Sequence, residues 1–143
     1  MAKKIIVCLC CLLLLFAAGC RSYDQKLDIG YFFKTGPEKA AIDFLQAMEG
    51  KDPGYIYDNL MLTRDKNNIS RQKYMEEFLH LLEDVEQIKI QSTVYLGYED
   101  NMSRVVVEFD TMYADGTQNR YKKYLYLMEE GNAWKIVFEK TFI

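Results

Sequence analysis

The sequence of 143 residues has room for one domain and hardly for two. Half of its residues are hydrophobic and 27% are charged, a composition typical of a folded domain rather than a disordered chain. The formal net charge is −3, and it becomes −5 if Lys3 and Lys4 are removed, so bulk charge repels nucleic acid and excludes it as an expected partner. All four cysteines lie within residues 1–20, which leaves no disulfide, cysteine metal site or cysteine nucleophile for residues 21–143.

The amino-terminal segment has the order of a secretory signal. Lys3 and Lys4 precede an uncharged run over residues 5–18, which is shorter than the roughly 20 residues that a membrane-spanning helix needs. A signal peptide needs only about 7–15 apolar residues between a basic start and small residues at the cleavage point. We therefore predict that residues 1–19 are a signal peptide.

Cys20 makes this prediction more specific. The segment Ala17-Ala18-Gly19-Cys20 resembles the bacterial lipobox, in which the cysteine thiol receives a diacylglycerol and the chain is cut just before it. The resemblance implies cleavage between Gly19 and Cys20 and lipid attachment to Cys20, although Ala17 stands where leucine is usual. An ordinary secretory signal and an uncleaved membrane anchor are the alternatives. The lipid would hold the protein, outside the cytoplasm, on the outer membrane or on the outer face of the cell membrane, depending on the cell type.

Residues 20–36 follow as the lipidated cysteine and a tether, of which residues 21–28 are polar and expected to be flexible. The run Tyr31-Phe32-Phe33 is too apolar for a linker, and we expect it to pack on the domain. The folded domain is predicted over residues 37–143.

Helical periodicity marks the first half of this domain. Pro37 and Glu38 begin a helix that ends at Gly50, because proline and negative charge both suit a helix amino terminus. A short second helix is predicted over residues 54–61, with Ile56 and Leu60 facing inward. Residues 63–68 are predicted to be a polar loop. Ser70 then caps a third helix over residues 71–84.

From Val85 onward the hydrophobic period changes from 3.6 to 2, which predicts four strands joined by short turns. The side chains expected to face the core are Ile88, Ile90, Val94 and Leu96 in the first strand, Val105, Val107 and Phe109 in the second, Tyr121, Lys123, Leu125 and Leu127 in the third, and Trp134, Ile136 and Phe138 in the fourth. The fourth strand is expected to reach almost to the end of the chain. Helices followed by an antiparallel meander predict an α+β domain with the helices on one face of the sheet.

Two stretches resemble the cystatin-like, nuclear transport factor 2-like (NTF2-like) superfamily. One is residues 37–54 (PEKAAIDFLQAMEGKDPG), which is similar to the first helix of small exported members, and the other is residues 124–138 (YLYLMEEGNAWKIVF), which is similar to their closing hairpin. The resemblance implies that the amino-terminal helices lie in the concave side of a curved four-stranded sheet over residues 37–143. Because the superfamily includes isomerases, dehydratases, adaptors, secretion subunits and lipoproteins, it implies the fold better than the function.

Enzymatic members of the superfamily resemble one another in burying an acid or a His–Asp pair in the cone. His80 is the only histidine, and it lies off the apolar stripe of its helix, which favours an exposed position. Asp58 is a second weak candidate, because a carboxylate buried at the mouth of the cone would have a raised pKa. Glu108 and Asp110 are expected to face solvent. We therefore assign no catalytic residue, metal site or cofactor.

Tyrosine is abundant, with 11 residues, and Tyr95, Tyr124 and Tyr126 are expected on the polar face of the sheet. Cross-strand pairing explains them, and a binding surface is the alternative. The sequence favours a membrane-anchored, non-enzymatic binding or adaptor domain of the cell envelope, with a protein partner, a second copy or a small apolar ligand as its target. A small-molecule isomerase or dehydratase that uses a cone pocket, and a structural subunit of an envelope or secretion complex, are the alternatives.

Overall fold

The computed structural model describes residues 29–141 of the chain, which divides into two compact units, residues 1–32 and residues 33–143. The first unit contributes one helical turn to the described part, α2 (Ile29–Phe32). The predicted signal peptide and Cys20 lie outside the described residues, and both stay predictions. No helix between residues 29 and 141 is long and apolar enough to cross a bilayer.

Helix α3 (Gly36–Glu49) confirms the first predicted helix and begins with a capping box. Thr35 Oγ1 accepts a hydrogen bond from the Glu38 N–H, and the Glu38 carboxylate accepts one from the Thr35 N–H at 3.0 Å. The ammonium group of Lys34 lies 3.2 Å from Glu38 and also donates to the Thr93 carbonyl at 2.8 Å. Since Thr93 belongs to strand β1 (Val85–Glu99), this contact fixes the start of α3 against the sheet.

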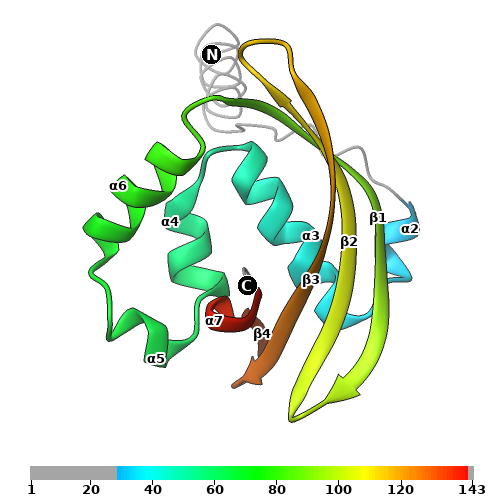
Figure 1. Ribbon diagram of the computed structural model, residues 1–143. Helices are drawn as coiled ribbons and strands as arrows, with labels where there is room; N and C mark the ends of the chain where they lie inside the picture. The colour runs from blue at the N-terminus through cyan, green and yellow to red at the C-terminus, as the bar shows by residue number, and fades with distance from the viewer. Residues whose placement is uncertain (1–28, 142–143) are drawn as a thin grey trace, which may run out of the picture. The chain divides into compact units, whose positions relative to one another are not determined.

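Shorter helical elements follow α3 and lie on the concave side of the sheet (Figure 1). Helix α4 (Pro53–Tyr55) continues into the π-helical turn η1 (Ile56–Leu60), in which Ile56 and Leu60 are buried as predicted. Helix α6 (Arg71–Leu81) begins after Ser70, whose side chain accepts from the Lys73 N–H, and it ends three residues before the predicted end.

Helix α5 (Thr63–Lys66) occupies the segment that we predicted to be a polar loop, so that prediction is wrong. The carboxylate of Glu130, 67 residues further along the chain, accepts hydrogen bonds from the Thr63 N–H and from Thr63 Oγ1 at 2.8–3.2 Å. The bond from the Thr63 N–H satisfies one of the backbone donors that a first helical turn leaves unpaired. The partner is distant in sequence, which is why local composition gave no sign of this turn.

The sheet confirms the predicted antiparallel meander, in the order β1-β2-β3-β4. Its other strands are β2 (Met102–Tyr113), β3 (Gln118–Glu130) and β4 (Ala133–Ile136). Figure 1 shows that the sheet is strongly curved and that α3 lies in its concave side. The turn between β1 and β2 consists of Asp100 and Asn101, both with positive φ (51° and 62°), the backbone that a two-residue type I′ hairpin needs. This α+β arrangement is the predicted one.

Bulges in β1 overturn part of its predicted alternation. The pairing register with β2 shifts between residues 90 and 92 and again between residues 95 and 97. An extra residue in one strand moves the side chains after it to the opposite face. Thr93 is therefore buried, whereas Val94 is 48% exposed and Leu96 is 42% exposed. The prediction that Val94 and Leu96 face the core is wrong for this reason.

The bulges also separate the tyrosines that we expected on one face. Tyr124 and Tyr126 lie on the outer face of β3, because they pair with the outward positions Val106 and Arg104 of β2. Tyr95 instead pairs with a core position of β2 and lies on the inner side of the edge strand. The expected shared face therefore holds for Tyr124 and Tyr126 alone.

The carboxyl-terminal end also differs from the prediction. Strand β4 has four residues and pairs with β3 only over residues 127–130, and the chain then turns into the helix α7 (Phe138–Thr141). The ring of Phe138 packs edge-on against Phe44, with 5.9 Å between ring centroids, and against Tyr74 at 6.3 Å. A fourth strand that continued through Phe138 would take this ring away from the helices, so the predicted long strand is wrong.

The main hydrophobic core lies between α3 and the concave face of the sheet. Its fully buried side chains include Phe44 of α3, Val107 of β2 and Leu125 of β3. A smaller cluster joins Leu62, Met102 and Val137. Phe33, which we expected to pack on the domain, is 85% exposed, so the expectation is wrong for this residue.

Candidate ligand-binding site

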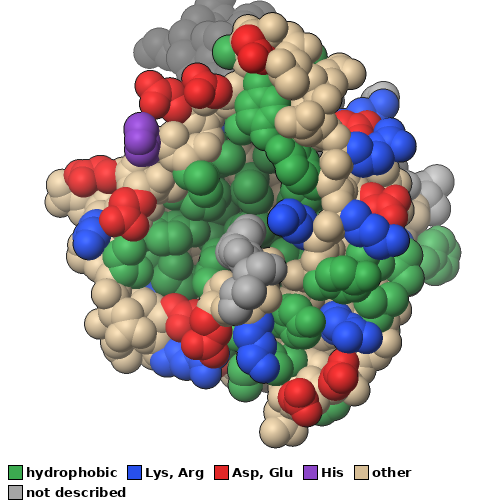
Figure 2. Space-filling model, viewed as in Figure 1, with side chains coloured by type: hydrophobic (Ala, Val, Ile, Leu, Met, Phe, Trp, Pro, Cys, Tyr) green, Lys and Arg blue, Asp and Glu red, His purple; other side chains and the backbone are tan. Residues whose placement is uncertain are grey.

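The concave side of the domain is hollowed, and its walls are hydrophobic (Figure 2). Four of the partly buried aromatic side chains that pack on the main core come from helices and strands together: Tyr74 of α6, Tyr113 of β2, Tyr121 of β3 and Phe138 of α7. We call the space beside these side chains the concave hollow. Each wall depends on a different element, so the hollow exists only in the folded chain.

Aromatic rings in tilted and edge-on contact form the helical wall of the concave hollow. Tyr74 lies 5.7 Å from Tyr57 and 5.6 Å from Phe78, measured between ring centroids, in addition to its contact with Phe138. Among residues 29–141, no group forms a hydrogen bond with the buried Tyr74 hydroxyl, and its burial raises the pKa of Tyr74 strongly. A buried hydroxyl without a partner costs free energy, so this ring is held in place by its aromatic contacts.

A hydrogen-bonded pair of phenols forms the polar part of the sheet wall. The hydroxyls of Tyr113 and Tyr121 are 2.8 Å apart, and Asn119 Nδ2 donates to Tyr121 at 3.4 Å. The hydrogen bond between them raises the pKa of Tyr113 and lowers the pKa of Tyr121, and either hydroxyl can be the donor. Whichever hydroxyl accepts this bond keeps its own proton for an acceptor oxygen of a ligand.

Lys123 adds a positive charge beside Tyr121. It is two residues further along β3, on the same face, and it pairs with Val107, whose side chain is in the core. The charge of Lys123 contributes to the lowered pKa of Tyr121, after the hydrogen bonds from Tyr113 and Asn119. Lys123 and the Tyr121 hydroxyl together suit an anionic or carbonyl oxygen, next to aromatic walls that suit an apolar body.

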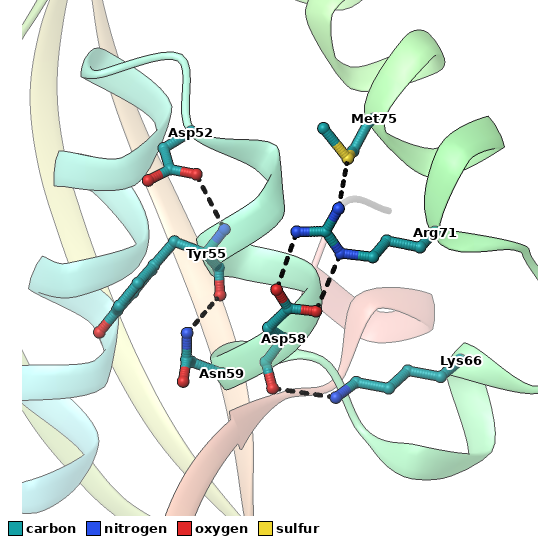
Figure 3. Close-up of polar contacts among 7 residues, drawn as sticks. All are labelled: Asp52, Tyr55, Asp58, Asn59, Lys66, Arg71 and Met75. Atoms are coloured by element: carbon teal, nitrogen blue, oxygen red, sulfur yellow. Dashed lines mark hydrogen bonds and ion pairs between the residues drawn. The ribbon is translucent and has the colours of Figure 1, made fainter.

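Asp58, one of the two weak catalytic candidates, lies in a surface ion pair. Figure 3 shows the Arg71 guanidinium facing its carboxylate, with Nε and Nη2 at 3.1 and 2.9 Å, while Lys66 donates to its carbonyl oxygen. The hydrogen bond from Arg71 lowers the pKa of Asp58, so the expectation of a buried carboxylate with a raised pKa is wrong. The pair links η1 to α6.

His80, the other candidate, is on the surface of α6 with its side chain 85% exposed, and its Nδ1 lies 3.2 Å from Glu83. Asp58 and His80 thus have separate partners and are not brought together in a closed cavity. Glu108 and Asp110 lie on the outer face of the sheet, where they pair with Lys122 and Arg120 as expected.

A second depression, of about 730 Å³, lies where the end of α3 meets the start of β1. Its carboxylates come from Glu49, Glu83 and Glu86, and burial raises the pKa of Glu49. Within residues 29–141, no group of three or more His, Cys, Asp or Glu side chains is placed to hold a metal ion.

Helices held in the concave side of a curved four-stranded antiparallel sheet define an NTF2-like α+β domain. The chain belongs to the NTF2-like N-terminal transpeptidase domain family, whose model matches residues 36–143. None of the curated proteins compared matches it. Among solved structures, a SEC-C motif containing protein from Rhodopseudomonas palustris is similar, with a TM-score of 0.54 and 11% identity, over 71% of this chain and 74% of that chain. At this identity the likeness shows the fold alone.

The sequence did not show which residues would line the concave hollow. Tyr121 and Lys123 were expected on the inner face of the third strand, but as core positions, and Tyr74 was not singled out. Their partners Tyr113 and Phe138 come from other elements. The inward Lys123 was the one available signal, since a lysine within an apolar alternation needs either solvent or an anion.

Proposed function

We propose that the protein is a lipid-anchored, non-catalytic binding domain of the cell envelope, and that the concave hollow is where it binds. The ligand is a small molecule or peptide end with an apolar body and an acceptor or anionic group. The arrangement of Tyr121 and Lys123 beside aromatic walls carries this proposal, because it places a hydroxyl group and a positive charge next to apolar side chains.

Two further observations support a binding role. The candidate general acids and bases, Asp58 and His80, are on the surface and paired with Arg71 and Glu83. The family is described as an NTF2-like amino-terminal transpeptidase domain, which names the domain by its place in the chain. An adaptor or ligand-sensing role fits that description better than chemistry in the hollow.

The lipid anchor is supported by the order of residues 1–20 and is tested by metabolic labelling with an alkynyl palmitate. The wild-type chain, expressed in a bacterium that processes lipoproteins, is expected to take up the label, and Cys20→Ser is expected to lose it. Cys8→Ser is the matched control, because Cys8 lies in the segment that is predicted to be removed. Equal labelling of Cys20→Ser and the wild type would contradict the anchor.

Binding in the hollow is tested with an aromatic sulfonate, 1-anilinonaphthalene-8-sulfonate, as a probe that combines an apolar body with an anion. We expect saturable binding at one site per chain in residues 21–143. Lys123→Ala is expected to weaken it about tenfold, since a charge-assisted hydrogen bond contributes about 1.4 kcal/mol or more.

Lys122→Ala is the control, because Lys122 is the neighbour of Lys123 on the opposite face of β3 and pairs with Glu108. Tyr121→Phe, with Tyr124→Phe as its outer-face counterpart, separates the hydroxyl from the ring. Equal losses in the inner-face and outer-face variants would show that the probe does not bind in the concave hollow.

A further inference from the structure

The edge of the sheet carries an exposed apolar surface that the concave hollow does not explain. Val94 and Tyr124 flank Val106 in one row across the outer face of the sheet, and Leu96 is the unpaired residue of the neighbouring bulge. Val94, Leu96 and Tyr124 are each more than two-fifths exposed. We call Val94, Leu96 and Tyr124, together with Phe33, the β1 patch.

Phe33 joins this surface through its neighbour in sequence. The side chain of Lys34 donates to the carbonyl of Thr93, the residue before Val94, so the point where the chain enters the domain lies beside β1. Phe33 is 85% exposed at that point. The apolar surface and the entry of the tether are therefore next to each other, although β1 lies far from residue 33 in the sequence.

The length of the tether limits what can cover the patch. Cys20 and Phe33 are 13 residues apart, a distance of at most about 45 Å when fully extended. If Cys20 carries the lipid, the β1 patch is held within that reach of the bilayer surface, where its local concentration relative to the membrane is high. From this geometry we infer that the β1 patch rests on a zwitterionic bilayer and orients the domain with β1 toward the membrane, an inference that rests on the proposed Cys20 anchor.

The chemistry of the patch suits the interfacial level of a bilayer. Phe33 and Tyr124 supply its aromatic rings. Two further exposed tyrosines, Tyr95 and Tyr98, belong to β1 and lie on the inner side of that edge strand. Tyrosine is enriched at membrane–water interfaces because it has an apolar ring and a polar tip. Among residues 29–141, β1 is an edge strand whose Thr93 carbonyl accepts from Lys34. The backbone N–H and C=O groups along this edge keep the contact shallow, because unpaired polar groups are costly in hydrocarbon.

The charges that border the patch are paired. Lys34 contacts Glu38 at 3.2 Å, Arg104 contacts Glu99 at 3.0 Å, and Lys122 contacts Glu108 at 3.2 Å. Among residues 29–141, these three basic side chains therefore add no excess of positive charge at the border that would recruit anionic lipid. This is why we assign the patch to a zwitterionic surface such as phosphatidylcholine.

The test uses the full chain, lipidated in the host and reconstituted into phosphatidylcholine vesicles. Residues 21–143 contain no cysteine, so Leu96→Cys can be labelled selectively with a bimane dye. Leu79→Cys is the matched control, because Leu79 is also 42% exposed but lies on α6, on the far side of the domain from β1 (Figure 1). Flotation with the vesicles is measured first, and quenching by doxyl-labelled lipid second.

We expect the protein to float and the dye at residue 96 to be quenched at least about twofold more than the dye at residue 79, as for a face that inserts into the interface. Adding Val94→Ser is expected to reduce quenching at residue 96, while Leu81→Ser on α6 leaves it unchanged. Flotation with equal quenching at both positions would overturn the membrane contact and leave the anchor intact. Failure to float would overturn the anchor, and with it the membrane contact.

Discussion

At the scale of single residues, Glu38 shows how one side chain can connect the chain's local and distant parts. Its carboxylate caps α3 through Thr35 and contacts Lys34, which in turn reaches β1. Burial raises the pKa of Glu38, but the hydrogen bonds from Thr35 and the charge of Lys34 outweigh burial and lower it below 4.5. A lowered pKa in the folded state means that ionised Glu38 stabilises the fold above that value and that this contribution is lost as the pH falls through the folded pKa.

Glu38→Gln should therefore lower the free energy of unfolding by about 1 kcal/mol at neutral pH, the typical value of a cap interaction. The same variant should lose less stability than the wild type between pH 5 and pH 3, because it has no carboxylate to protonate at this position. Urea unfolding at several pH values measures both effects. Glu77→Gln, on the exposed face of α6, is the control, and an equal effect there would contradict the assignment.

Gly36 is required for a packing reason rather than for its backbone angles. A Cβ atom at this position would overlap the indole nitrogen of Trp134 and lie 2.8 Å from its Cδ1. Gly36→Ala should therefore destabilise the domain by about 1–3 kcal/mol and shift the fluorescence of Trp134. At Gly54 the nearest atom to a new Cβ is the flexible end of Arg71, so Gly54→Ala should be nearly neutral. Thermal melts with tryptophan emission compare the two variants, and equal destabilisation would contradict this explanation.

At the scale of elements, the bulges in β1 decide which valines contribute to stability. Val94 and Val107 both belong to runs that alternate in the sequence, yet Val107 is fully buried and Val94 is 48% exposed. A side chain contributes by the apolar area that it removes from water. The register, which depends on pairing with β2, therefore assigns different roles to two identical residues.

Val107→Ala should cost about 2 kcal/mol, because it removes two buried methyl groups and leaves a cavity. Val94→Ala should change the free energy of unfolding by less than about 0.5 kcal/mol, as is usual for a surface position. Chemical denaturation of both variants measures the difference. Similar costs at the two positions would mean that the strand lacks the bulge between residues 90 and 92.

At the scale of the whole molecule, the domain has a main hydrophobic core and a smaller cluster, and the question is whether the two unfold in one transition. The main core contains Phe44, whose ring contacts Phe138 of α7, and the smaller cluster contains Val137, the residue before Phe138. Because the consecutive residues Ile136, Val137 and Phe138 pack alternately in the main core, the smaller cluster and the main core, loss of one cluster should expose the other. We expect one cooperative transition, as is usual for a single domain of this size.

Phe44→Ala should lower the free energy of unfolding by about 3–5 kcal/mol, the usual cost of removing a buried aromatic ring. Helical circular dichroism and Trp134 fluorescence should still change at the same denaturant concentration. Two separate transitions would contradict the coupling of the clusters through the carboxyl-terminal residues. Leu81→Ala, at an exposed position on α6, is the control and should leave the midpoint almost unchanged.

The sequence by itself determined the class of the fold and the order of its elements, because hydrophobic period, caps and turn residues are local properties of the chain. The helix from Gly36 to Glu49, the inward Ile56 and Leu60 and the four-stranded meander all follow from such signals. The lipid anchor on Cys20 also depends on a short segment alone, and it stays a prediction.

Only the tertiary structure decided what depends on partners distant in sequence. The hydrogen bonds from Thr63 to Glu130 stabilise α5 in a segment that is polar in sequence. The register between β1 and β2 places Val94 and Leu96 on the outside of the sheet. The contact with Phe44 holds Phe138 in a helix and not in a continued strand. The concave hollow is also of this kind, because Tyr74, Tyr121 and Phe138 come from three different elements. A pattern within one segment cannot indicate such contacts, since the free energy that selects them belongs to pairs of segments and not to either one.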